Sequence, residues 1–122
     1  MLNSRAVATA TVIGTVLQVA MVVAGHTNAS ISAMFAAGGM GISLVAGLLY
    51  AKYAAPSSAG DSIKGGAIAG GVCALLGIGI SFMLGDVTAA IIGLGTLSSA
   101  ITGALGGWIG AFIFRSAPVS AR

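Results

Sequence analysis

The stretch GGAIAGGVCALLGIGISFML, residues 65–84, decides the fold of this chain. It holds no charged residue, and it has the length of about 20 residues that an α-helix needs to cross a hydrocarbon layer roughly 30 Å thick. Three more uncharged runs occupy residues 6–25, 31–51 and 87–114. A transmembrane barrel needs alternating strands of about ten residues, and that pattern does not occur here. We therefore expect an all-α protein with four transmembrane helices.

The composition agrees with this class. Charged residues make up 6% of the 122 residues and hydrophobic residues 57%, whereas a soluble domain carries about 25% charged residues. A soluble domain of this size cannot bury so much apolar surface. We expect a single four-helix domain over residues 1–122, without a separate soluble part, in a plasma or inner membrane.

The connections differ in length. A polar turn at 26–30 offers Asn28 or Ser30 as the N-cap of the second helix, and Asp86 is placed to cap the fourth. The middle connection, residues 52–64, contains Pro56, serines and Gly60, which is typical of a flexible loop. Two short turns around a longer loop predict two helical hairpins joined by a linker.

The cations predict the orientation. All of them fall on the side that the termini share with the middle loop: Arg5, Lys52, Lys64, Arg115 and Arg122. Cytoplasmic loops carry an excess of Lys and Arg, so both termini are expected in the cytoplasm. Tyr50 and Tyr53 are expected as interfacial aromatics at the same boundary.

These cations have two interpretations beyond orientation. Lys52, Lys64 and Arg115 either contact anionic lipid headgroups or only mark the topology, and the second interpretation is favoured. Five scattered cations form no stripe or patch, so nucleic acid is not an expected partner.

Glycines and other small residues recur every fourth position in three of the runs. Such rows let helix backbones approach closely, which is how helices associate in lipid. The expected packing positions are Gly39, Gly47, Gly65, Gly77, Gly95, Gly103 and Gly107. The fourth run has a second row beside the first. Its helix is therefore expected to contact two neighbours, either as the central helix of the bundle or with one row against another subunit.

Polar residues are sparse within the runs. The sequence has no Glu, and both Asp61 and Asp86 fall in predicted loops, so the carboxylate that usually marks coupled transport is missing from the predicted spans. Thr11, Thr15 and Gln18 form a polar stripe on the first helix. They either line a pore, or the threonines bond back to their own helix while Gln18 bonds to a neighbouring one; the second interpretation is favoured.

No residue set predicts catalysis, a cofactor or a metal. His26 and Asp86 pair with each other, bind a cation or, as favoured, remain two solvated turn residues. The single cysteine, Cys73, is expected to be a small packing residue.

We therefore expect no enzyme. The favoured function is an accessory or structural subunit that packs within a larger membrane assembly. The alternative is a homo-oligomeric pore or small uncoupled transporter. The expected partners are the lipid bilayer and other membrane-protein chains or copies of this one.

Overall fold

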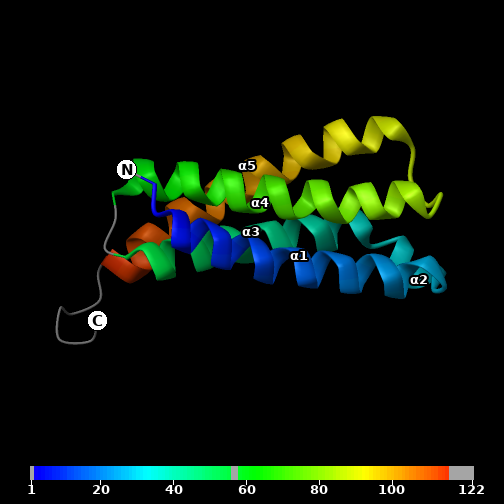
Figure 1. Ribbon diagram of the computed structural model, residues 1–122, viewed down its shortest axis with the longest axis horizontal. Helices are drawn as coiled ribbons and strands as arrows, with labels where there is room; N and C mark the ends of the chain where they lie inside the picture. The colour runs from blue at the N-terminus through cyan, green and yellow to red at the C-terminus, as the bar shows by residue number, and fades with distance from the viewer. Residues whose placement is uncertain (1, 56–57, 116–122) are drawn as a thin grey trace.

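The computed structural model describes residues 2–55 and 58–115, apart from the side chain of Arg115. Every element in this part of the chain is an α-helix (Figure 1). The helices are α1 (Ser4–His26), α2 (Ala29–Ser32), α3 (Phe35–Ala54), α4 (Ala59–Met83) and α5 (Ala89–Arg115). The prediction of an all-α chain is confirmed. Four helices, α1, α3, α4 and α5, are long and apolar enough to cross a membrane, which identifies a membrane protein.

The second predicted span begins differently from the expectation. The Asn28 side chain accepts hydrogen bonds from the backbone N–H groups of Ser30 (3.0 Å) and Ile31 (3.2 Å). Asn28 is therefore an N-cap, as predicted, but it caps the single turn of α2. A turn at 33–34 follows, and α3 starts at Phe35 without a side-chain cap.

The prediction of a loop over 52–64 is wrong for most of its length. Residues 52–54 belong to α3 and residues 59–64 to α4, while residues 56–57, with Pro56, lie outside the described part. The Ser58 hydroxyl accepts a hydrogen bond from the Asp61 N–H at 3.1 Å. Asp61 thus lies in the first turn of α4, where the helix dipole favours a carboxylate.

The turn between α4 and α5 is closed by Gly85, whose φ of +81° favours glycine. The N–H of Gly85 donates to the Phe82 carbonyl and the N–H of Asp86 to the Ser81 carbonyl, each at 3.0 Å, which is the Schellman pattern of helix ends. Asp86 does not cap the next helix as predicted. That helix starts at Ala89, three residues later.

The helices are arranged with α3 and α4 between α1 and α5. Helix α4 packs most extensively against α5 and also contacts α1 and α3; α5 contacts α3 as well. In an apolar stretch of 18 residues in α4, 44% of the residues are buried, against 17% in such a stretch of α5. Helix α4 is therefore the most buried helix. One of the two expectations from the sequence instead makes α5, the fourth predicted helix, the central one.

The two ends of the bundle differ. At one end, the charged end, lie the starts of α1 and α4 and the ends of α3 and α5 (Figure 1). At the other, the turn end, lie α2 and the α4–α5 turn, and the first part of α5 diverges from the other helices. The buried core lies in the charged half of the bundle, and its members are Ala6, Ala10, Ala46, Tyr50, Ala54, Ala69 and Cys73.

Tyr50 belongs to this core and is not an interfacial residue as predicted. Its side chain is fully buried, and its ring covers Gly65 of α4. The phenol donates a hydrogen bond to Asp61 Oδ2 at 2.9 Å and accepts one from the N–H of Asn3 at 3.1 Å. A single side chain therefore joins α3, α4 and the start of α1.

Candidate functional site

The expected packing glycines Gly103, Gly107 and Gly47 lie where three helices meet. A Cβ atom on Gly107 would overlap the Ser62 carbonyl oxygen of α4, and one on Gly103 would lie 2.9 Å from the Gly70 Cα. A Cβ on Gly47 of α3 would overlap the Gly103 carbonyl oxygen and lie 2.8 Å from the Gly107 N. At these positions backbone faces backbone, and no flexible side chain can make room.

The other expected packing positions face side chains. A Cβ on Gly65 would overlap the Tyr50 ring, one on Gly77 would lie 2.7 Å from Gln18 Cβ, and one on Gly95 would lie 2.5 Å from Ile78 Cδ1. Gly39 differs. Its nearest neighbour would be the Gln18 Oε1 atom at 3.5 Å, an ordinary contact distance.

The second small-residue row of α5, which includes Gly106 and Gly110, also packs against another helix of this chain. A Cβ on Gly106 would overlap the Leu44 carbonyl oxygen, and one on Gly110 would lie 2.6 Å from Ala51 Cβ, both on α3. Helix α5 thus contacts two neighbours, as expected. Gly106 and Gly110 are buried against helices of the same chain, while Ser98 and Thr102 of the same row are only partly buried. That one row meets another subunit stays a prediction.

Gln18 links three helices. Its side chain is 2% exposed, and its Nε2 donates to the Gly39 carbonyl at 3.0 Å and to the Ser43 hydroxyl at 3.4 Å, both on α3. The Ser43 hydroxyl in turn donates to the Gly70 carbonyl of α4 at 3.2 Å. The predicted bond from Gln18 to a neighbouring helix is confirmed.

The two threonines of the polar stripe behave otherwise. The hydroxyls of Thr11 and Thr15 are buried and have no hydrogen-bond partner in the described part of the chain. The prediction that they bond back to their own helix is wrong for both. Such back-bonding occurs elsewhere, from Ser98 to the Leu94 carbonyl at 2.8 Å and from Thr102 to the Ser98 carbonyl at 2.7 Å.

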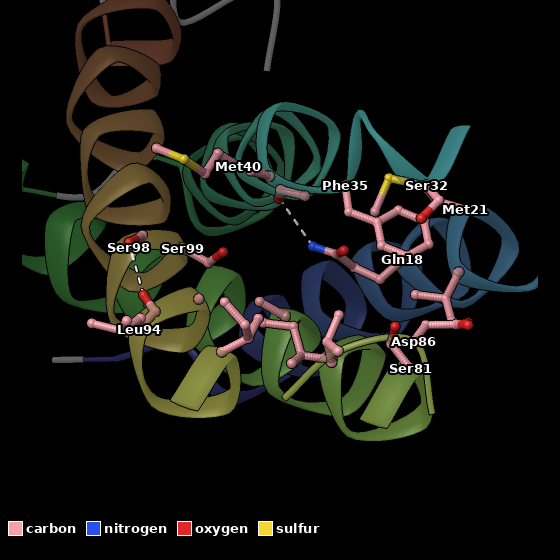
Figure 2. Close-up of a pocket in the computed structure, with 18 of the residues that line it drawn as sticks. Gln18, Met21, Ser32, Phe35, Met40, Ser81, Asp86, Leu94, Ser98 and Ser99 are labelled. Atoms are coloured by element: carbon pink, nitrogen blue, oxygen red, sulfur yellow. Dashed lines mark hydrogen bonds between the residues drawn. The ribbon is translucent and has the colours of Figure 1, made fainter. Parts of the chain in front are cut away.

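Gln18 also forms part of a cavity of about 410 Å³ at the turn end (Figure 2). The cavity lies between the first part of α5 and the facing parts of α1, α3 and α4. Thr11 and Thr15 are not among its lining residues. The lining is mainly apolar, with six large side chains: Met21, Phe35, Met40, Ile78, Ile91 and Leu94. Its polar side chains are those of Gln18, Ser32, Ser81, Asp86, Ser98 and Ser99.

Except for Gln18, sequence reasoning missed this cavity. One signal was present. The small-residue row of α5 stops at Gly95, because the position one step earlier is Ile91. Close backbone contact cannot continue past that side chain, and Ile91 lines the cavity where α5 leaves the bundle.

His26 and Asp86 form an ion-pair geometry at the turn end. His26 Nδ1 lies 2.8 Å from Asp86 Oδ2 and 3.1 Å from Oδ1, with side chains 42% and 20% exposed. The expectation of two separately solvated residues is wrong, and the pairing alternative is the one observed. Within the described ranges, no three His, Cys, Asp or Glu side chains gather to hold a metal ion.

The candidate headgroup contacts lie at the charged end. Lys52 and Lys64 are exposed, and Lys52 Nζ lies 5.9 Å from the centre of the Tyr53 ring. The side chain of Arg115 and the whole of Arg122 lie outside the described residues. A role of these cations in lipid binding stays a prediction.

Comparisons of this chain with protein-family models, with curated proteins and with solved structures return no match. The chemistry of the side chains described above is therefore the basis for a functional proposal.

The polar stripe allows a first test, because Gln18 and Thr15 are expected to contribute differently to the free energy of unfolding. Gln18→Leu removes the link to Gly39 and Ser43 and is expected to lower the free energy of unfolding by about 1 kcal/mol, as for hydrogen bonds between membrane helices. Thr15→Val, of nearly the same shape, removes a buried hydroxyl without a partner and is expected to be neutral or stabilising. Equilibrium unfolding in detergent micelles, followed by circular dichroism, measures both. A larger loss for Thr15→Val than for Gln18→Leu would contradict the assigned contacts.

Proposed function

We propose that this chain is a non-enzymatic accessory subunit that packs within a larger membrane assembly. The observation that supports the proposal is the outer face of α5. The side chains of Leu97, Ile101, Leu105 and Trp108 are all exposed there, and they follow one another at intervals of three or four residues. We call these four residues the α5 outer stripe.

This pattern resembles an interface more than a lipid-facing surface. Large apolar side chains that recur every three or four residues on one helix face can interlock with the side chains of a second helix. Aromatic residues are enriched in protein interfaces, and Trp108 is fixed by an edge-to-face contact with Phe112, with ring centres 5.3 Å apart.

The proposal includes the packing of the chain itself. The four spans form two hairpins, α1 with α3 and α4 with α5, joined through their small-residue faces. Both termini lie in the cytoplasm, because Arg5, Lys52 and Lys64 lie at the charged end and no Lys or Arg lies in either turn at the other end. The inner faces of the four helices pack against one another within the chain. The α5 outer stripe is therefore the surface that we assign to a partner.

Cysteine cross-linking in native membranes tests the proposal. Ile101→Cys and Leu105→Cys, each in a Cys73→Ala background, are treated with an oxidant or a short bifunctional thiol reagent. Val12→Cys and Val16→Cys are the matched controls, since these residues of α1 are 62% and 63% exposed in the middle of their span. We expect adducts with a different chain from the α5 positions and none from the α1 positions.

The other outcomes are equally decisive. Adducts between copies of this chain alone, from the α5 positions, would replace the accessory subunit by the homo-oligomeric alternative. Equal yields from α1 and α5, or none from either, would mean that the α5 outer stripe faces lipid, and the proposal would be wrong.

A further inference from the structure

We propose that the cavity at the turn end is a binding site for a small organic cation, an ammonium group attached to an apolar body. This inference concerns binding by the chain itself, so it does not depend on the assembly proposed above. It rests on the size of the cavity, on the unused hydrogen-bonding groups in its lining and on the sign of its charge.

The apolar part of the cavity suits a compact hydrophobic body. A volume of about 410 Å³ falls within the range of roughly 300–1,000 Å³ typical of small-molecule sites. Phe35 offers an aromatic ring, which attracts a cation at its face. Met21 and Met40 are flexible and polarisable, so they adapt to ligands of different shape (Figure 2).

One polar group in the lining lacks a partner. Ser81 is 2% exposed, and its hydroxyl has no hydrogen-bond partner in the described residues. A buried hydroxyl without a partner costs free energy, and rotation of the Ser81 side chain toward the cavity would let a ligand with a donor group recover that cost on binding. Ser81 is near Asp86 in Figure 2 and lines the cavity with it.

Two other polar groups in the lining are acceptors. The hydrogen bonds of the Gln18 amide are made by its Nε2, so the carbonyl Oε1 is left to accept one. Asp86 is the only Asp, Glu, Lys or Arg in the lining, and its carboxylate accepts hydrogen bonds as well. The serine hydroxyls of the lining can donate as well as accept, so the preference for a positively charged ligand rests on the Asp86 carboxylate and on the lack of Lys and Arg in the lining.

The carboxylate of Asp86, which pairs with His26, lies where the ammonium group of such a ligand would bind. His26 Nδ1 is 2.8 Å from the carboxylate, and His26 is half-exposed at the surface while Asp86 reaches the cavity. An ammonium group in the cavity approaches the same carboxylate from the inner side. Asp86 therefore serves as the counter-ion of the ligand, with His26 holding the carboxylate in position.

Calorimetric titration of the purified chain in lipid nanodiscs tests the inference. The probes are 4-phenylbutylammonium and its neutral analogue 4-phenylbutanol, with the heat of empty nanodiscs subtracted. The ammonium probe is expected to bind saturably and at least about tenfold more tightly than the alcohol. Asp86→Asn is expected to weaken the ammonium probe about tenfold and leave the alcohol unchanged, and Ser81→Ala to weaken the ammonium probe about fivefold.

Asp61→Asn is the matched control, because it also removes one negative charge but at the charged end, away from the cavity. It is expected to leave the affinity for the ammonium probe unchanged. Circular dichroism of each variant in the same nanodiscs shows that it is folded before titration. Absence of saturable binding, equal losses in Asp86→Asn and Asp61→Asn, or equal affinities for the ammonium probe and the alcohol would each overturn the inference. The last result would mean that the cavity accepts any apolar chain, including a lipid tail.

Discussion

Gly107→Ala is expected to lower the free energy of unfolding by about 3 kcal/mol, the upper end of the usual cost of overpacking. The added methyl group would overlap the Ser62 carbonyl oxygen, and the Gly66 Cα lies 3.4 Å from the same point. Both obstacles are backbone atoms of α4, so α4 and α5 must move apart along their contact. Equilibrium unfolding in detergent micelles, followed by circular dichroism, measures the loss.

Gly93→Ala is the control on the same helix. A Cβ atom on Gly93 would meet nothing within 4 Å. Since alanine favours an α-helix over glycine by about 1 kcal/mol in water, this change is expected to be neutral or stabilising. The two identical substitutions should therefore differ, with a clear loss of stability at Gly107 and none at Gly93. Equal effects would show that the close contact at Gly107 does not contribute to the stability of the bundle.

Tyr50→Phe is expected to lower the free energy of unfolding by about 2 kcal/mol. The change keeps the ring over Gly65 but removes the hydrogen bonds to the Asp61 carboxylate and the Asn3 N–H. A hydrogen bond to a charged group contributes about 1.5–3 kcal/mol. The same unfolding measurement applies.

Tyr53→Phe is the control, because it removes a tyrosine hydroxyl from the same helix, three residues after Tyr50. Tyr53 is 45% exposed, so its loss is expected to stay within about 0.5 kcal/mol. A comparable loss in both variants would contradict a specific role of the Tyr50 hydroxyl. It would point instead to a general effect of tyrosine near this end of α3.

The helices could be predicted from the sequence because length and lack of charge are local properties. The contact positions of α5 could be suggested for a similar reason, since a row such as Gly103 and Gly107 marks one face of one helix. These patterns leave little freedom, because a bare backbone in lipid must form a helix and a smooth helix face admits close neighbours.

The polar contacts could not be predicted in the same way. Tyr50 bonds to Asn3, which is 47 positions away in the sequence, and no local pattern indicates that pairing. The sequence predicts a loop at Asp61 because Pro56, serines and a glycine precede it, yet Ser58 caps a helix that includes Asp61. Thr11 and Thr15 lack partners because of how neighbouring helices cover them, which only the packed bundle determines.

The divergence of α5 has a consequence for the depth of the cavity. The residues that line the cavity all belong to the turn half of the bundle. Towards the charged end the bundle is filled by side chains such as Ala46, Cys73 and Tyr50, each fully buried. Within the described residues, the cavity of a single copy is therefore a recess that is closed on the side of the charged end.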